Sequence, residues 1–345
     1  MLKKLTELKG EERLERDIFL PNGLIILGEG TVLKKLYIEK LGEIGISEVH
    51  IVEESESKDI YDTLKEEHHA IVKNVFERHI YQHDTVLSEL RETAEEIVEK
   101  ILENEDVSHN LINIREKSTD VYEHSLNVCA YSTMIALRFG WNKHKIPDIS
   151  TGALLHDIGL RYINADYMNE DIENRNDQIG KEYRKHPVYG YTAVEKYDWM
   201  SKTAKDIIFM HHCTLDRTGF PMMLKHLPKE VQIVAVSDLF DRKISGIGCK
   251  QMKVYEILEY IKVISGVKYD KEICDCFTSM VATYPNGTKV KLLTGETAMV
   301  IKQNGDFKER PVIRLICDKD GNNVKAEEII DMMKNQSVFI NEVLE

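Results

Sequence analysis

Residues 152–159 read GALLHDIG, an apolar helical stretch that carries a histidine and an aspartate near its end. Burying two polar side chains in such a segment is costly unless both have partners. The pair His211-His212 follows the similarly apolar KDIIFM, and Asp238 follows VQIVAVS. A buried metal cluster would satisfy these side chains together, because imidazole and carboxylate are ligands of iron, manganese, zinc and nickel.

The complete set of candidate ligands spans the middle of the chain and is large enough for more than one metal ion. Its members are His124, His156, Asp157, His186, His211, His212 and Asp238. Two metal ions about 3.5–4 Å apart form a clamp suited to phosphoester hydrolysis. A lone histidine in a helix is usually a packing or surface residue, and we prefer that interpretation for His50, His144 and His226. The metal-site hypothesis therefore depends on the joint pattern.

Five blocks of sequence around these residues resemble the HD-GYP domain phosphodiesterases, a branch of the HD superfamily. The blocks are EHSLNVCAYS around His124, LLHDIG around His156, HPVYG around His186, HHCTLDRTGFP around His211 and SDLFD around Asp238. They occur in the order typical of that family, over residues 116–282. The resemblance implies a mainly α fold, an HD-type helical bundle. It also implies hydrolysis of a cyclic dinucleotide, chiefly cyclic di-GMP, at a centre of two or three divalent transition metals.

The resemblance assigns roles to individual residues. All the candidate ligands match metal-binding positions, and Asp157 is also a catalytic candidate. Some family members carry a further ligand one helical turn before the first histidine, where Asp120 stands. Asp120 is therefore a candidate ligand for a third metal; the alternative is a helix cap, because residues 118–120 (STD) are favourable N-cap chemistry. Asp241 is the second catalytic candidate, as a group that positions a water or accepts a proton.

Several substrate-facing positions depart from the family pattern. Leu160 stands where the family has a lysine that contacts the scissile phosphate, and Cys213 replaces the glutamate after the double histidine. The tripeptide that names the family is Gly-Phe-Pro here, which keeps the aromatic ring but loses its hydroxyl. The candidates for substrate binding that remain are Arg161, Gly219, Phe220, Pro221 and Lys250.

The main functional prediction is a metal-dependent phosphodiesterase that converts a cyclic dinucleotide to the linear dinucleotide or to GMP. Loss of the lysine would lower the rate on the order of 100-fold. A catalytically weak or inactive receptor in bacterial signalling is therefore the first alternative, and another HD-superfamily nucleotide phosphohydrolase is the second. Iron and manganese are the expected ions, nickel and zinc are also compatible, and cyclic di-GMP and mixed cyclic GMP-AMP both stay open.

Composition limits the classes of partner. The net charge of −13 over 345 residues disfavours DNA or RNA as a partner. The chain has no apolar run of about 18 residues and no secretory signal at its N-terminus, so we expect no membrane attachment and a cytoplasmic location. A long helical region leaves a homodimer or a signalling-protein partner open.

The pattern divides the chain into four stretches. Residues 1–55 are expected to form a small α/β unit and residues 56–115 a charged helical connector with apolar residues three to four apart. Residues 116–282 carry the HD-GYP resemblance, and residues 283–345 are expected to form a small β-rich unit. The acidic, polar insert between His156 and His186 is expected to form a lid or loop over the site.

Local signals predict several elements within these stretches. In the first stretch, strands are expected at residues 16–20, 24–27 and 48–52, and a helix at residues 31–41. In the last stretch the expected strands are residues 288–293, 297–303 and 312–318, separated by glycine-containing turns. The acidic side chains of the insert are expected to form a solvated face: Asp166, Glu170, Asp171, Glu173 and Asp177.

Overall fold

The structure is a computed structural model of the chain, which divides into two compact units, residues 1–59 and 60–345. It describes residues 2–5, 8, 14, 18–19, 25–27, 31, 33–44, 46, 48–51, 68–75, 86–103, 120–142, 144–163, 171–305, 307–324 and 328–344. The predicted boundaries after residues 55, 115 and 282 stay predictions. No helix in these described ranges is both long and apolar enough to cross a lipid bilayer.

The first unit combines two short antiparallel strand pairs with one helix. Its elements are β1 (Leu2–Lys4), β2 (Ile18–Phe19), β3 (Ile25–Leu27), α1 (Lys35–Glu43) and β4 (Glu48–His50). Strand β1 pairs with β4, and β2 pairs with β3. Leu33, Leu41 and Val49 are buried in its core. The predicted α/β character is confirmed, although β1 was not expected from the sequence.

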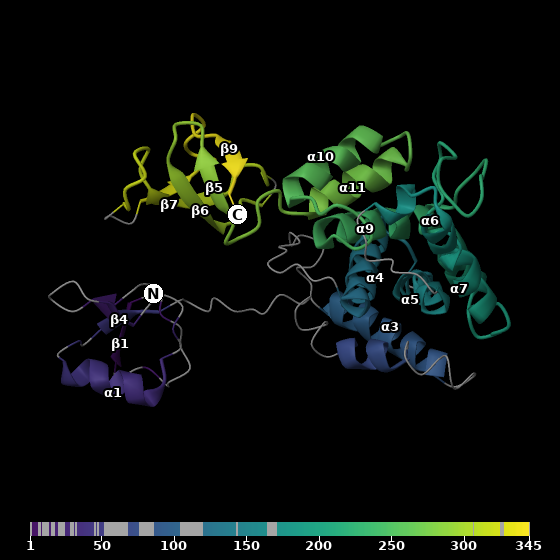
Figure 1. Cartoon of the computed structure of the whole chain (residues 1–345), viewed down its shortest axis with the longest axis horizontal. Helices are drawn as coiled ribbons and strands as arrows, with labels where there is room; N and C mark the ends of the chain where they lie inside the picture. The colour runs from purple at the N-terminus through teal and green to yellow at the C-terminus, as the bar shows by residue number, and fades with distance from the viewer. Residues whose placement is uncertain are drawn as a thin grey trace. The chain divides into compact units, whose positions relative to one another are not determined.

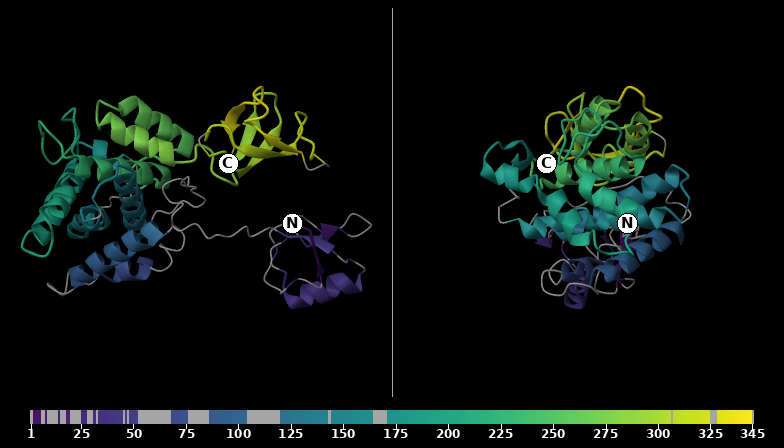
Figure 2. Two further views of the ribbon diagram at one scale, coloured as in Figure 1. Left: turned by 180° about the vertical axis from the view of Figure 1, so that it is seen from behind. Right: turned by 90° about the vertical axis from the view of Figure 1, so that its right-hand side faces the viewer.

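The second unit is mainly helical through residue 280 (Figures 1 and 2). Residues 68–75 are helical. The labelled elements are α3 (Val86–Glu103), α4 (Val121–Arg138), α5 (Ile146–Leu155), the short 3-10 helices η3 (Ile158–Tyr162) and η4 (Ile172–Asn174), α6 (Gln178–Tyr183), α7 (His186–Val194), α8 (Lys202–Met210), α9 (Lys229–Ser245), α10 (Val254–Ile264) and α11 (Lys271–Met280). The predicted helical bundle is confirmed.

Helix α4 lies at the centre of this bundle and contacts α3, α5, α9 and α11. Every residue of α4 from His124 to Ala136 is buried, and so is every residue of α9 from Val231 to Arg242. A helix that is buried on all sides must be surrounded by other helices, whereas a surface helix needs only one apolar stripe. The polar residues on these two helices are therefore forced to find partners inside the protein.

Side-chain and glycine caps fix where the helices begin and end. Asp120 accepts hydrogen bonds from Tyr122 N and Glu123 N at the start of α4, and Ser201 accepts one from Ala204 N at the start of α8. Such caps satisfy backbone N–H groups that have no partner within the helix. Helix α9 ends at Gly246, whose φ of 78° is left-handed.

The C-terminal segment forms an antiparallel sheet of five described strands in the order β8-β7-β6-β5-β9 (Figure 1). Its strands are β5 (Lys289–Leu292), β6 (Thr297–Lys302), β7 (Val312–Cys317), β8 (Ile329–Asp331) and β9 (Ile340–Val343). Alternate residues of β5 are buried, among them Val290, which packs with Ala298 and Ile313. The predicted β-rich unit is confirmed, and β8 and β9 are strands that the sequence pattern did not indicate.

Phe277 on α11 tests the packing of the helical core. Its ring is fully buried, with its centroid 4.9 Å from that of Phe240 and 6.4 Å from that of Tyr131. Phe277→Ala should lower the free energy of unfolding by about 3–5 kcal/mol, measured by urea denaturation of the helical signal. Val263→Ala, at an exposed position on α10, should change it by less than about 0.5 kcal/mol. Equal effects of the two changes would contradict this packing.

Candidate metal centre

The predicted metal ligands converge from five helices and the turns that follow them. His124 lies on α4, Asp238 on α9, and His186 begins α7. His156 is the residue that ends α5, and His211 is the residue that ends α8. Asp157 and His212 follow them directly in the chain. All seven side chains are buried, so segments far apart in sequence place them in one interior cluster.

The ligand atoms form two groups that share one carboxylate. One group contains Asp157, His186, His211 and His212, and the other contains His124, His156 and Asp157; within each group the ligand atoms lie within 4.8 Å of one another. Asp238 joins the second group, since its Oδ1 lies 3.2 Å from Nε2 of His124 and 3.6 Å from Nε2 of His156. Two adjacent ligand sets with a shared Asp157 are the arrangement expected of a binuclear metal site.

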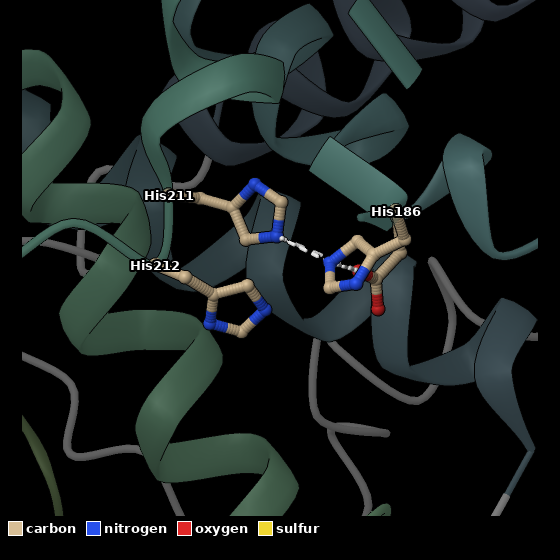
Figure 3. A group of neighbouring side chains, drawn as sticks. His186, His211 and His212 are labelled. Atoms are coloured by element: carbon tan, nitrogen blue, oxygen red, sulfur yellow. Dashed lines mark hydrogen bonds and ion pairs between the residues drawn. The ribbon is translucent and has the colours of Figure 1, made fainter. Parts of the chain in front are cut away.

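Backbone carbonyls hold the histidine rings with Nε2 directed into the cluster. The Nδ1 atoms of His156, His186 and His211 lie 2.7, 2.8 and 3.0 Å from the carbonyl oxygens of Ala153, Tyr183 and Ile208. A carbonyl only accepts, so Nδ1 carries the proton and leaves the Nε2 lone pair for a metal. The rings of His186, His211 and His212 face one another (Figure 3). Nε2 of His186 lies 3.1 Å from Nε2 of His211.

Asp241 orients His124 from the side away from the other ligands. Its Oδ2 lies 2.7 Å from Nδ1 of His124, while its Oδ1 accepts a hydrogen bond of 2.9 Å from Nδ2 of Asn127. A carboxylate on the second nitrogen fixes a histidine ligand and increases its basicity. Both oxygens of Asp241 therefore have a structural partner, and its role as a proton acceptor stays a prediction.

Two buried polar atoms in the cluster make no hydrogen bond. They are Oδ1 of Asp157, which lies 3.2 Å from Nε2 of His186, and Nε2 of His212. Buried polar atoms are nearly always satisfied in folded proteins. A divalent cation would satisfy both atoms, so the residues of the cluster fit the metal centre that the sequence predicted. The identity of the ion is not determined by these contacts.

Neighbouring side chains in the cluster shift one another's pKa. Burial opposes ionisation of Asp157, but His156 and the neighbouring histidines outweigh it and hold the pKa of Asp157 well below its usual range. Burial likewise opposes protonation of His156, but Asp157 and Asp238 raise its pKa to about 10. Burial lowers the pKa of His211 to about 4. A divalent ion between the carboxylates would take the place of the proton on His156.

The structure places Asp120 at the cap of α4. Its Oδ1 accepts a hydrogen bond of 2.8 Å from Tyr122 N, and its Oδ2 lies 2.8 Å from Nε2 of His69. The helix-cap alternative is thus what the geometry shows, and Asp120 belongs to neither ligand group found among the described residues. Its role as a ligand of a third metal stays a prediction.

The Gly-Phe-Pro tripeptide packs against His212. The ring of Phe220 stacks on that of His212 with centroids 4.4 Å apart, and Phe220 N donates a hydrogen bond of 3.1 Å to the carbonyl oxygen of His212. A Cβ at Gly219 would lie 2.1 Å from the same carbonyl oxygen, so only glycine fits there. Pro221 follows through a cis peptide bond. These contacts support the metal ligand, while substrate binding by the tripeptide stays a prediction.

The two predicted cationic contacts differ in exposure. Arg161 is partly exposed, but its Nε is buried and makes no hydrogen bond. Lys250 is exposed in the turn after α9. No described contact connects either side chain to the ligand groups. Their roles in substrate binding stay predictions.

Two charged residues at the cluster were missed by the sequence analysis. Arg242 donates from Nε to Oδ1 of Asp238 over 2.8 Å and from a terminal nitrogen to Oε1 of Glu173 over 2.5 Å. That Glu173 oxygen also lies 3.5 Å from Nδ1 of His212. The expectation of a solvated face is therefore wrong for Glu173, whereas Asp166 and Glu170 fall outside the described residues. The spacing of four between Asp238 and Arg242 was a usable signal; nothing local marked Glu173.

Comparisons with known proteins agree with this geometry. Residues 121–243 match the HD domain, and residues 289–345 match a KOW domain associated with HD domains. The chain is 23% identical over 243 residues to the cyclic di-GMP phosphodiesterase PA4108 of Pseudomonas aeruginosa, covering 69% of this chain and 58% of that protein. It is 22% identical over 219 residues to the cyclic di-GMP phosphodiesterase PdeB of Borreliella burgdorferi, covering 62% and 55%.

The fold resembles that of a solved HD-GYP protein. Bd1817, an HDG"Y"P protein from Bdellovibrio bacteriovorus, aligns with a TM-score of 0.54 and 18% identity, covering 81% of this chain and 98% of that one. The present chain spans less than two thirds of the length of either curated relative. The resemblance predicted from the five sequence blocks is thus confirmed as an HD domain with this fold and with distant relatives that are cyclic di-GMP phosphodiesterases.

Asp241→Asn tests whether the second aspartate orients a ligand. We expect a loss of about 10–100-fold in metal affinity, because the amide makes His124 a weaker ligand. Competition of Mn²⁺ with a metallochromic chelator measures this change. Asp206→Asn is the matched control, because Asp206 is a partly buried aspartate of α8 that pairs with Lys202 and not with a candidate ligand. Unchanged affinity together with lost turnover would instead assign Asp241 to proton transfer.

Gly159→Ala tests the close packing of η3 against α7. A Cβ at Gly159 would lie 1.9 Å from the carbonyl oxygen of His186 and 2.6 Å from Gly190 N. The substitution must displace the start of α7, so we expect substoichiometric metal by elemental analysis. Gly42→Ala, where the nearest atom belongs to Leu5 at 3.9 Å, should bind the wild-type amount. Full metal occupancy in the Gly159 variant would show that the packing is not required.

Proposed function

We propose that this HD-domain protein, with its KOW-like C-terminal domain, is a metal-dependent phosphodiesterase that opens a cyclic dinucleotide, with cyclic di-GMP as the preferred substrate. The observation that carries the proposal is the pair of buried ligand groups that share Asp157. The relatives named as cyclic di-GMP phosphodiesterases support the choice of substrate. The product would be the linear dinucleotide or GMP.

Each residue type of the centre would have a separate role in such a reaction. When bound, two divalent ions supply Lewis acidity toward the phosphoester and an activated water. The histidines keep their Nε2 lone pairs available because backbone carbonyls hold Nδ1. Asp157 supplies negative charge to both ligand groups, and burial excludes competing water from its neighbours. Asp241 holds the orientation of the His124 ring through its contact with Nδ1. Iron or manganese is the proposed ion, with nickel and zinc as alternatives.

The environment of Leu160 supports a receptor as the second candidate function. Leu160 is 6% exposed and packs in an apolar cluster with Ile172 and Tyr183. It offers no charge to a phosphate and lies where the related family has a lysine. A protein with intact ligands and a weakened phosphate contact is suited to bind a cyclic dinucleotide and turn it over slowly. In that case the response would pass to a signalling partner or between the subunits of a homodimer in the cytoplasm.

Turnover of cyclic di-GMP decides between these functions. The protein would be purified without chelator and without oxygen, supplied with Fe²⁺ or Mn²⁺, and assayed by chromatography of the products. We expect linear dinucleotide from the wild type and none from the His156→Ala/Asp157→Ala variant, because that variant removes at least one ligand from each group. A chelator should abolish the same activity, and restored metal should recover it.

Negative outcomes separate the alternatives. Retention of cyclic di-GMP by the metal-loaded protein without hydrolysis would favour the receptor. Hydrolysis of cyclic GMP-AMP in preference to cyclic di-GMP would change the substrate and keep the reaction. Neither binding nor hydrolysis of a cyclic dinucleotide, with activity on deoxynucleotides, would favour another HD-type phosphohydrolase.

A further inference from the structure

A buried arginine adjoins the cluster of metal ligands. Arg242 on α9 is 4% exposed, and its Nε donates to Oδ1 of Asp238, an oxygen that also lies 3.2 Å from Nε2 of His124. The guanidinium therefore touches a metal ligand directly. Guanidinium is the side-chain group best suited to bind phosphate, because its planar fork matches two phosphate oxygens.

A second carboxylate, that of Glu173, accepts a hydrogen bond from another nitrogen of this guanidinium. Oε1 of Glu173 accepts from a terminal nitrogen of Arg242 over 2.5 Å and lies 3.5 Å from Nδ1 of His212. The Glu173 side chain is 25% exposed, whereas those of Arg242, His212 and Asp238 are at most 5% exposed. Glu173 is thus the partly exposed end of a row of charges that leads from the surface to the metal ligands.

The segment that carries Glu173 has its own anchor. Ile172, the preceding residue, is fully buried and packs with Leu160 and Tyr183. Arg184 donates hydrogen bonds from one terminal nitrogen to the carbonyl oxygens of Glu173 and Arg175, over 2.7 and 2.8 Å. Leu160 stands where the HD-GYP family has a phosphate-binding lysine. By packing against Ile172 it helps to place Glu173 beside the metal ligands.

We infer that Arg242 is the cation that binds the substrate phosphate at this centre. The Glu173 carboxylate occupies the phosphate position on the guanidinium until the phosphate displaces it. A carboxylate and a phosphate oxygen are competing acceptors for one guanidinium. A phosphate bound to Arg242 would lie beside Asp238, next to the metal ligands. The positive charge absent at Leu160 is then supplied from α9. This inference rests on the proposed phosphodiesterase only for the identity of the natural substrate.

The geometry also defines a competing role for Glu173. Its Oε1 lies 3.5 Å from Nδ1 of His212, so a metal ion held by Nδ1 instead of Nε2 would take Glu173 as a ligand. The two roles have opposite signatures when the carboxylate is neutralised. Loss of a competitor strengthens phosphate binding and leaves the metal in place, whereas loss of a ligand weakens metal binding.

Glu173→Gln tests the inference in the full-length protein loaded with Mn²⁺. Inorganic phosphate is titrated by isothermal calorimetry, and manganese content is measured on the same samples. We expect phosphate to bind about tenfold more tightly than to the wild type, with the metal content unchanged. Glu182→Gln is the matched control in the same segment, because Glu182 pairs with Lys185 and Tyr189 and has no contact with the described ligands. It should bind phosphate as the wild type does.

Arg242→Lys supplies the second arm of the test. Lysine keeps one positive charge beside Asp238 but loses the fork, so phosphate binding should weaken in this variant. In the Glu173→Gln/Arg242→Lys protein, the gain from Glu173→Gln should largely disappear, because that gain acts through the guanidinium. Additive effects of the two changes would overturn the inference.

Hydrolysis of bis(p-nitrophenyl) phosphate adds a kinetic readout that does not depend on the cyclic dinucleotide. Glu173→Gln should lower KM for this diester and leave kcat within about twofold, because a competitor for substrate binding is removed. Unchanged or weaker phosphate binding, or loss of manganese, would overturn the inference. If phosphate binding shifts as expected but cyclic di-GMP is not hydrolysed, the proposed function fails and the role of Arg242 stands.

Discussion

The fold depends on satisfying Asp157, a fully ionised carboxylate in the interior of a helical bundle. Burial opposes this charge, and His156 is the largest of the influences that outweigh the cost. Nε2 of His156, His186 and His211 lies 3.2–3.6 Å from the carboxylate, where these imidazoles and Asp157 would together hold a divalent ion. These imidazoles come from different helices, so the helices cannot shift relative to one another without exposing an unpaired charge. Breaking one partner of a buried charged network is strongly destabilising. The cluster therefore fixes the packing of the bundle as well as its chemistry.

Helix ends give the cluster its geometry. His156 ends α5 and bonds to the carbonyl of Ala153, and His211 ends α8 and bonds to that of Ile208. The final carbonyls of a helix lack the usual backbone donor four residues on, and His156 N reaches the carbonyl oxygen of Ala153 only at 3.5 Å. A histidine at that position supplies the donor through Nδ1 and in the same step directs Nε2 away from the helix. Ring orientation is thus a by-product of ending the helix, which explains why short helices can hold a precise site.

The sequence could predict the ligands because each one interrupts a strongly apolar segment, as His156 does after GALL and Asp238 after VQIVAVS. Burial and polarity are visible locally in such segments. The bond between Glu173 and Arg242 spans 69 residues and joins the short 3-10 helix η4 to α9, so no local pattern encodes it. Strands β8 and β9 were missed for a related reason: each is short, and its pairing is set by distant partners.

The departure from the family pattern at Leu160 also involves the segment that follows it. Taken alone, Leu160 removes a charge from the active centre. In the folded protein, its side chain joins Ile172 in an apolar cluster that anchors the next segment, and that segment delivers Glu173 to Arg242. A lysine at position 160 would be buried beside Ile172 and Tyr183 without a carboxylate partner in that cluster, which is unfavourable. The apolar residue at position 160 and the arginine on α9 are therefore compatible with each other, and we expect α9 rather than position 160 to supply the positive charge of the site.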